Sequence, residues 1–437
     1  NTTLEIINGS FNESKIWNGD TNWAYPITLT LKNYLDLSVV DAYNSSYQNV
    51  DVKIVSANRT VYASSGYGGS DARTDASGKI PLQALTYLIH NGSGNVTNYN
   101  DAMIYLKFAP YNEKVYTINI TTSSAKILVF LGPIIVDANG NGHFTKIQDA
   151  IDNATAGNTI LVWAGTYNED LEIDKMLTLI GNGTTSSIIN GTGTSNTDAV
   201  KITADWVNLS GFKIKNSGRN GIFINSDHVT ISGNNIIDCG DGTPDAGIYL
   251  SSSDSNTISG NTITGSTDDG IYLTGSDNNT ISNNTIEDND NGIYIDDDSD
   301  DNIIKHNNIT GNDDYGIYSL NSVDARYNWW GDASGPGGAG PGSGDSINNA
   351  TLVDYSPWFG KTVASSPMTF YTDNVIQDVI DNATAGDTIR VYAGTSEENI
   401  VIDKSITLIG NGSFYSIIDG GDNGDVVYIT GGNVTFS

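Results

Sequence analysis

The chain repeats one pattern five times between Gly221 and Pro336. The copies read GIFINSDHVTISGNNI, GIYLSSSDSNTISGNTI, GIYLTGSDNNTISNNTI, GIYIDDDSDDNIIKHNNI and GIYSLNSVDARYNWW, and they begin 22 to 26 residues apart. A period of this length, with Gly and Asn between short apolar segments, is typical of a solenoid. The unit is too short for a helical hairpin. The sequence therefore predicts short parallel strands that stack rung upon rung about 4.8 Å apart.

Stacking of this kind places like residues above one another in columns. Apolar side chains at alternate positions point inward and form the core, in two columns: Ile231, Ile258, Ile281 and Ile304, and Ile248, Ile271, Ile293 and Ile317. A column of Asn occupies one corner, where the side-chain amides bond to the neighbouring rungs and the backbone accepts a left-handed conformation. Its members are Asn234, Asn261, Asn284, Asn307 and Asn328.

An outward column of aromatic rings runs along the same strands as the second core column. Its members are Phe223, Tyr249, Tyr272, Tyr294 and Tyr318. Such a row is either a platform on which sugars stack or a set of side chains that shield one another. The structural interpretation is favoured, because repetition of the fold accounts for the row without a ligand.

A column of carboxylates is predicted at another corner. It contains Asp227, Asp254, Asp277 and Asp300, and Asp298 adds to it on one rung. Like charges about 5 Å apart repel by about 1 kcal/mol in water and several-fold more at a half-buried corner, and a divalent cation would remove this cost. Calcium is the expected cation, because it accepts carboxylate and carbonyl oxygens in loose geometry. The alternative is a set of solvated corners screened by salt.

The composition excludes two classes of partner. The chain has 437 residues, with 20 Lys and Arg against 51 Asp and Glu, and a formal net charge of -31. Nucleic acids and anionic membranes are therefore not natural partners, since both are negatively charged. Cys239 is the single cysteine, so no disulfide is predicted. No apolar run approaches the ~20 residues of a membrane span.

Potential N-glycosylation sites are frequent. About nineteen of the 51 Asn residues lie in Asn-X-Ser/Thr sequons, where composition alone gives roughly ten. The excess indicates a secreted, glycosylated protein at the cell surface. Representative sites are Asn8, Asn58, Asn119, Asn208, Asn308 and Asn411.

Residues 1–133 lack the repeat and predict a β-sandwich. Alternating segments such as YPITLTLKNYLDLSVV and NVDVKIVSA are separated by turn-rich stretches. The turn at Thr74, Asp75 and Gly78 resembles that of carboxypeptidase-regulatory-like sandwiches, and an immunoglobulin-like sandwich is the alternative. Domains of this kind are usually spacers on surface proteins.

A parallel β-helix of about eight rungs is expected over residues 134–360. Ile147, Ala150 and Ile151 lie at helical spacing and predict a short amphipathic helix that covers the open apolar end. After Tyr327, the Gly- and Pro-rich stretch NWWGDASGPGGAGPGSGD is incompatible with strand pairing. We expect the solenoid to end there, with the two Trp residues as a lid, and a tail strand to follow around TLVDYSPWFG.

The beginning of the solenoid returns at Ile376. The segment IQDVIDNATAGDTIRVYAGTSEENIVIDKSITLIGNG repeats the one that begins at Ile147, at an offset of 229, so residues 361–437 predict the start of a second, incomplete β-helix. This copy stops at Ser437, the counterpart of Ser210. We expect either further rungs in a longer polypeptide or a second subunit that covers this end head to tail.

Three segments together resemble a known family: IQDAIDNATAGNTILVWAGTY, the GIYL…NTISGNTI rungs and NWWGDASGPG. They are similar to the pectin-lyase-like, NosD-type parallel β-helix repeats, which abound in archaeal, particularly methanogen, surface-layer and adhesin-like proteins. The resemblance covers about residues 137–437. It implies a right-handed parallel β-helix in an extracellular setting.

The superfamily also includes polysaccharide lyases and hydrolases. These need a base beside calcium-binding carboxylates, or two carboxylic acids at a fixed separation. His306 and Arg326 lie on adjacent rungs, and Asp268 and Asp269 lie at a corner that a solvated loop would explain. No catalytic motif of the family maps onto these residues. The sequence therefore assigns no catalytic residue and no organic cofactor.

The two other classes of function are a glycan-binding adhesin and a structural subunit. Tandem modules add length without adding a new site, which favours the structural reading. We therefore expect a non-catalytic subunit of a surface layer, sheath or filament that associates with itself outside the cell. Glycans are the partner in the alternative reading.

Overall fold

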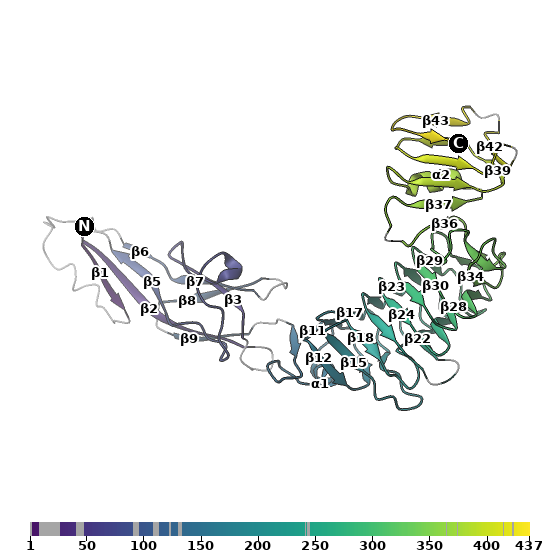
Figure 1. Cartoon of the computed structure of the whole chain (residues 1–437). Helices are drawn as coiled ribbons and strands as arrows, with labels where there is room; N and C mark the ends of the chain where they lie inside the picture. The colour runs from purple at the N-terminus through teal and green to yellow at the C-terminus, as the bar shows by residue number, and fades with distance from the viewer. Residues whose placement is uncertain are drawn as a thin grey trace. The chain divides into compact units, whose positions relative to one another are not determined.

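The computed structural model describes residues 2–7, 27–40, 48–90, 96–107, 113–121, 124–129, 133–240, 242, 245–363, 365–373, 375–413, 415–421 and 424–437. The chain divides into two compact units, Asn1–Pro133 and Ile134–Ser437. Regular structure in both units is almost entirely β-strand (Figure 1). The predicted all-β class is confirmed.

The first unit contains two sheets. One has the order β1-β2-β5-β6, with β9 also paired to β2, and the other has the order β4-β3-β7-β8. Their strands are β1 (Thr2–Ile7), β2 (Ile27–Val40), β3 (Asp51–Ser56), β4 (Arg59–Ala63), β5 (Gln83–His90), β6 (Val96–Asn98), β7 (Asp101–Lys107), β8 (Lys114–Asn119) and β9 (Ser124–Val129). A 3-10 helix, η2 (Ser65–Tyr67), follows β4.

Both sheets contribute to one apolar core. Leu37 on β2, Ile54 on β3 and Ile104 on β7 are fully buried in the same cluster, which makes the unit a sandwich. The predicted turn is present: the Asp75 carboxylate accepts the N–H groups of Ser77 (2.8 Å) and Lys79 (3.0 Å), and Gly78 has a φ of +70°.

The second unit is a right-handed parallel β-helix with three strand faces (Figure 1). The first face has ten strands: β10 (Ile134–Val136), β11 (Thr159–Val162), β14 (Thr178–Gly181), β17 (Asn208–Ser210), β20 (Thr230–Ser232), β23 (Thr257–Ser259), β26 (Thr280–Ser282), β29 (Ile303–Lys305), β32 (Val323–Asp324) and β35 (Val353–Asp354).

The second face has seven strands: β12 (Gly165–Asn168), β15 (Ser187–Asn190), β18 (Lys213–Lys215), β21 (Asn235–Ile237), β24 (Thr262–Thr264), β27 (Thr285–Glu287) and β30 (Asn308–Thr310). The third has nine: β13 (Leu171–Ile173), β16 (Val200–Ile202), β19 (Ile222–Ile224), β22 (Ala246–Ser251), β25 (Asp269–Thr274), β28 (Asn291–Ile295), β31 (Tyr315–Ser319), β34 (Gly344–Ile347) and β33 (Pro336–Gly338).

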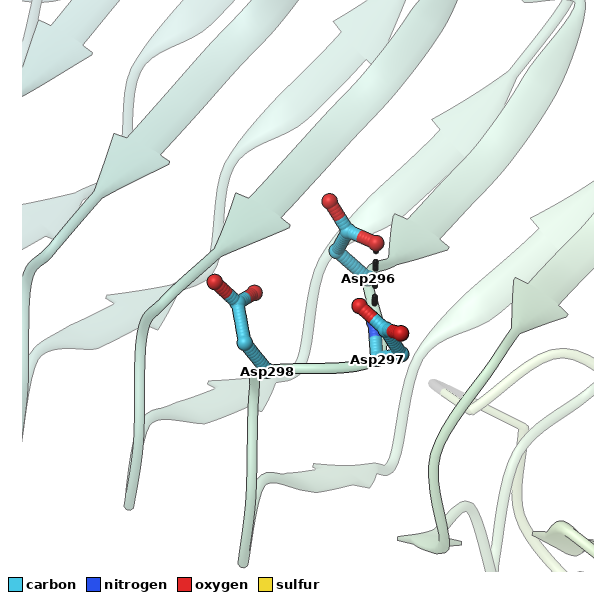
Figure 2. Close-up of side chains that lie close together, drawn as sticks. All are labelled: Asp296, Asp297 and Asp298. Carbon is cyan, nitrogen blue, oxygen red and sulfur yellow. Dashed lines mark hydrogen bonds between the residues drawn. The ribbon is translucent and has the colours of Figure 1, made fainter.

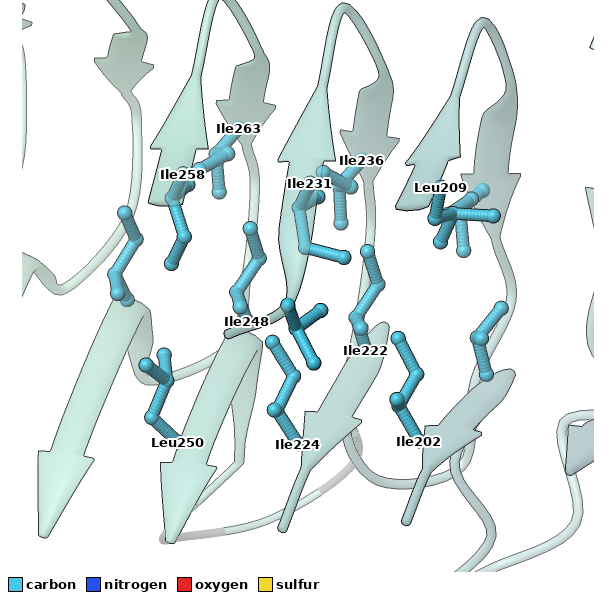
Figure 3. Packing of buried hydrophobic residues seen from close by; sticks show 14 of the residues in the cluster. Ile202, Leu209, Ile222, Ile224, Ile231, Ile236, Ile248, Leu250, Ile258 and Ile263 are labelled. Carbon is cyan, nitrogen blue, oxygen red and sulfur yellow. The ribbon is translucent and has the colours of Figure 1, made fainter. Parts of the chain in front are cut away.

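The core is the predicted set of stacked Ile columns (Figure 3). Ile231 pairs in register with Ile258, which pairs with Ile281, and so on to Ile304. All eight Ile residues of the two predicted columns are fully buried. Each rung thus buries its apolar face only against its neighbours, as expected for a solenoid.

Glycine opens each repeat because the rungs approach closely there. A Cβ on Gly247 would lie 2.8 Å from the carbonyl oxygen of Gly270, and one on Gly270 would lie 2.6 Å from that of Gly292. No side chain fits at these positions without a shift of the backbone.

The predicted Asn column is a buried hydrogen-bonded ladder. The Oδ1 atom of Asn261 accepts the backbone N–H (2.9 Å) and the amide Nδ2–H (3.2 Å) of Asn234, and Asn261 repeats both bonds to Asn284. Each Nδ2 also donates to a backbone carbonyl, which for Asn261 is that of Ile231 (2.9 Å). The amides thereby satisfy polar backbone groups that the corner would otherwise leave buried without partners.

Two further polar columns were not predicted. Asn256, Asn279 and Asn302 form a second ladder before the first face, with N–H to Oδ1 distances of 2.8 and 2.9 Å. A third runs from Asn289 to Asn312 (3.2 Å), and Asp345 ends it by accepting from Asn312.

The predicted cap helix is α1 (Ile147–Asn153), which buries Ile147, Ala150 and Ile151 against the first rungs. Its first two N–H groups donate to the Glu169 carboxylate, from Ile147 at 2.8 Å and from Gln148 at 3.1 Å. A carboxylate at this end of a helix satisfies free donors and complements the helix dipole.

The prediction that strand pairing stops after Tyr327 is wrong. Strand β34 pairs with β31, and β35 pairs with β32, so the faces continue past the Gly- and Pro-rich stretch. That stretch forms the turns around β33, where Pro336 is the first residue of an edge strand and its missing N–H costs no ladder bond. Trp330 is fully buried in the first core, as expected of a lid, whereas Trp329 packs against the core of the second solenoid.

The second solenoid repeats the first. Its helix is α2 (Ile376–Asn382), and its strands are β36 (Trp358–Phe359), β37 (Thr369–Thr372), β38 (Thr388–Val391), β39 (Gly394–Glu397), β40 (Ile400–Ile402), β41 (Thr407–Gly410), β42 (Ser416–Asp419), β43 (Val427–Ile429) and β44 (Thr435–Phe436). Glu398 accepts from the N–H groups of Ile376 (2.7 Å) and Gln377 (2.8 Å), just as Glu169 does for α1.

Specific contacts join the two solenoids. The Tyr327 hydroxyl donates to the Asp378 carboxylate on α2, and the Val363 N–H donates to Asn308 Oδ1 at 2.8 Å. Among the described residues, neither helix combines the length and the apolar character that a membrane crossing requires.

The Asn ladder is testable by one substitution. Asn261→Ala should lower the free energy of unfolding by about 2–4 kcal/mol, because four side-chain hydrogen bonds are lost and buried donors stay unpaired. Urea denaturation measures the change. The neighbouring Thr262→Ala, at a half-buried outward position of β24, should cost no more than about 0.5 kcal/mol. Equal losses for the two variants would contradict a structural role of the ladder.

Candidate functional site

The aromatic column lies on the outside of the third face. Successive ring centroids from Phe223 to Tyr318 are 5.6, 4.8, 4.9 and 5.0 Å apart. The pairs Tyr249–Tyr272 and Tyr294–Tyr318 are stacked, with interplanar angles of 14° and 12°. The pair Phe223–Tyr249 is tilted (57°) and the pair Tyr272–Tyr294 is edge-to-face (88°). The rings are half-buried, and ring faces cover one another within the two stacked pairs.

The predicted Asp residues form a hydrogen-bonded column. Each carboxylate accepts the backbone N–H of the Asp on the next rung, at 2.7 Å for Asp254 to Asp227, 2.8 Å for Asp277 to Asp254 and 2.7 Å for Asp300 to Asp277. Asp205 extends the column below, and the Asn321 amide closes it at Asp300 (2.6 Å). The backbone thus provides a reason for Asp at this corner that needs no metal.

Asp298 lies with two neighbours of its own rung. The carboxylates of Asp296, Asp297 and Asp298 offer oxygens within 4.8 Å of one another, the only such group of three metal-ligating side chains in the described part of the chain (Figure 2). Asp298 Oδ1 accepts from the Gly275 N–H at 2.6 Å. Free oxygens remain, and three carboxylates suit a hard cation such as calcium.

A buried carboxylate lies at the start of β25. Asp269 is only 3% exposed, in contrast with the solvated corner that the sequence indicates. Burial, with Asp268 and Asp290 nearby, raises the pKa of Asp269 from 3.8 to about 7, although the Asn291 amide donates to it at 2.9 Å. The pKa of Asp268 is also raised, by burial and by Asp290 and Asp245.

The charged residues considered for catalysis have structural partners. The Arg326 guanidinium binds Asp324 through two bonds of 2.8 Å, and these bonds raise the pKa of Arg326. His306 stacks on Phe359 with the ring centroids 5.7 Å apart, and burial and Lys305 lower the pKa of its imidazole. Neither group is therefore placed as a base beside a free carboxylate.

The predicted glycosylation sites differ in accessibility. Asn58, Asn119, Asn208 and Asn411 are exposed. Asn308 is half-buried and accepts from the Val363 N–H, and Asn8 lies outside the described residues.

A surface cavity beside Trp206 was not predicted. It has a volume of about 590 Å³ and includes Trp206, Asn208, His228, Thr230 and Thr257 among its lining residues. Trp206 is 57% exposed, and His228 stacks on it with ring centroids 4.1 Å apart. The sequence signal for this cavity is that two aromatic residues, Trp206 and His228, occupy a corner position that later rungs fill with small polar residues. These are Ser255, Asn278 and Asp301.

The pKa of Asp269 makes stability depend on pH. Because the folded-state pKa lies above the unfolded value, the protonated form favours folding: this stability is complete below about pH 4 and is lost as the pH rises through about 7. Deprotonation of Asp269 should lower the free energy of unfolding of the wild type by roughly 2–4 kcal/mol across this pH range. Asp269→Asn should flatten that fall, whereas the exposed Asp313→Asn should not. Parallel pH profiles for wild type and Asp269→Asn would contradict the assignment.

Calcium binding at the carboxylates of the Asp296 rung remains a prediction. At fixed ionic strength, added calcium should raise the melting temperature by about 2 °C or more relative to a chelator. Asp298→Asn should reduce this difference, and Asp101→Asn on the first unit should leave it unchanged. A wild-type midpoint that does not respond to the chelator would exclude the site.

Comparison with known proteins agrees with this architecture. Residues 178–328 match the family described as "Right handed beta helix region". A cell surface glycoprotein of Methanothermus fervidus is 41% identical over 105 residues, which is 23% of this chain and 17% of that protein. The chain therefore spans less than a fifth of the length of that relative.

Solved structures of carbohydrate-active enzymes also align. Alginate lyase from Paenibacillus sp. str. FPU-7 has a TM-score of 0.38 and 19% identity, covering 66% of this chain and 96% of the lyase. Pectin methylesterase from carrot has a TM-score of 0.24 and 12% identity, covering 70% and 84%. Both scores are low, and neither activity is transferred to this chain. The family match and the strand topology together identify residues 178–328 as a right-handed β-helix region.

Proposed function

We propose that this chain is a non-catalytic structural section of a cell-surface protein, a subunit of a surface layer, sheath or filament outside the cell. Its similarity to a cell surface glycoprotein supports the location. The high sequon content and the exposed sequons Asn58, Asn119, Asn208 and Asn411 support a glycosylated exterior.

The observation that carries the proposal is that the repeated polar and aromatic side chains bind one another. Amides of the Asn ladder bond to the next rung, carboxylates of the Asp column accept from the next rung, and rings of the aromatic column contact the next ring. Side chains arranged in this way stiffen the solenoid. A catalytic or recognition surface would instead turn its functional groups toward a ligand.

A polysaccharide lyase or hydrolase is the less supported reading. Arg326 is paired with Asp324, and His306 packs against the rings of Tyr327 and Phe359. A general base must be free to take a proton at the pH of the reaction. The pairing of Arg326 and the packing of His306 argue against both as bases.

A glycan-binding adhesin is the main alternative. The aromatic column is its natural platform, but sugars stack on ring faces, and in the pairs Tyr249–Tyr272 and Tyr294–Tyr318 one face of each ring is covered by its neighbour. The column therefore supports rigidity more than binding.

Self-association is supported by exposed apolar side chains of the second solenoid. On and beside β42 and β43, the exposed fractions are 65% for Tyr415, 47% for Ile417 and 55% for Tyr428. Large apolar side chains in exposed positions are candidates for contact with another copy of the chain.

The test combines location with assembly. A membrane-impermeant amine reagent on intact cells should label the native protein, and the purified chain should sediment as assemblies. The double variant Ile417→Glu, Tyr428→Glu should shift it to monomers, whereas Val61→Glu, at a 40% exposed position of the first unit, should not. Unlabelled native protein together with a monomeric wild-type chain would contradict the proposal.

A further inference from the structure

We propose that Asn208 carries an N-linked glycan whose first sugar ring lies on the indole of Trp206, so that the chain's own glycan fills the cavity beside β17. This inference rests on the proposed function as a glycosylated surface protein, and it names the occupant of a site that the fold leaves open.

Trp206 adopts a backbone conformation that a large side chain rarely takes. Its φ is +62° and that of His228 on the next rung is +57°, in the left-handed region that favours Gly and Asn. At the same corner, Ser255 has a φ of +58°, and two later rungs carry residues that accept this conformation more readily than Trp: Asn278 (+55°) and Asp301 (+53°). A Trp residue at a strained and exposed corner indicates that its side chain makes an interaction that offsets the strain.

The two rings form one apolar wall. His228 stacks on Trp206 with ring centroids 4.1 Å apart and an interplanar angle of 24°. This contact covers one side of the indole, and the indole as a whole remains 57% exposed. Met176, which is 43% exposed, extends the apolar surface of the same cavity.

A row of polar side chains forms the floor. Thr178, Asn208, Thr230 and Thr257 are in register on adjacent strands of the first face. Within the described residues, none of these four side chains makes a hydrogen bond. His228 is the one titratable side chain among the described lining residues. An aromatic wall beside free hydroxyl and amide groups suits a neutral sugar, which has an apolar ring face and hydroxyls at its edge.

Asn208 places such a sugar in the cavity. It is the acceptor of the sequon Asn208-Leu209-Ser210, it is exposed, and it lines the same cavity as Trp206 two residues earlier. The donor would be a lipid-linked oligosaccharide phosphate of the cell. A bond forms from Asn208 Nδ2 to the anomeric carbon, the bond from that carbon to the phosphate oxygen breaks, the lipid phosphate leaves, and Nδ2 loses one proton.

The test uses the conformational preference of Asn at this corner. In unglycosylated protein from a bacterial host, Trp206→Asn should leave the melting temperature unchanged or raise it, because Asn accepts the left-handed backbone. In protein from the native or another glycosylating host, the same variant should lower it by about 2 °C or more, because the sugar loses its stacking partner. Ser210→Ala, which removes the sequon, should abolish this difference between hosts, and Thr60→Ala at the Asn58 sequon should not.

Each outcome decides the proposal. Glycopeptide mass spectrometry that finds Asn208 bare while Asn58 is occupied would overturn it and leave the proposed surface function intact, whereas bare sequons throughout would count against that function as well. An equal effect of Trp206→Asn in both hosts would overturn the stacking. Binding of free oligosaccharides to the unglycosylated wild type, lost in Trp206→Asn, would show that the occupant is a soluble sugar and would also overturn it.

Discussion

The buried amide ladder is the interaction on which the solenoid depends. A coil with three faces must turn sharply at its corners, and each turn carries backbone N–H and C=O groups into a water-free interior. Such groups are costly when unpaired. Asn261 meets this need with one short side chain, because its oxygen accepts from the rung below while its nitrogen donates to a carbonyl and to the rung above. The ladder thereby fixes the register of every strand that follows it.

The Asp column pairs backbone N–H groups in the same way, but at a corner that is exposed to solvent. Asp254 accepts the N–H of Asp277 just as Asn261 accepts that of Asn234, but a carboxylate at the surface remains hydrated and contributes charge. The large negative charge of the chain is thus partly a by-product of its corners. Asp269 shows the opposite case, since burial of one carboxylate next to others raises its pKa to about 7.

The sequence predicted the parts of the fold that repeat. Ile, Asn and aromatic columns recur at one period, so stacking alone assigns their environment. The sequence did not reveal the role of Glu169 or Glu398, because a residue that caps a helix from 21 or 22 positions away leaves no local pattern. The continued pairing of β34 and β35 was missed since a Gly- and Pro-rich insertion hid the register. The Trp206 cavity depends on an irregular rung, and periodicity says nothing about positions that depart from it.

The glycine column has a consequence for how such a chain changes length. Gly247, Gly270 and Gly292 each face the carbonyl of the next glycine, so every rung meets its neighbour through the same surface, and no contact of this column reaches further than one rung. Duplication of a complete unit restores each junction, whereas insertion of a single residue within a strand would turn side chains to the wrong face. Single residues are therefore added or lost at the corners, where the spacing of the repeats varies from 22 to 26 residues, whereas the length of the solenoid along its axis changes in whole-rung steps.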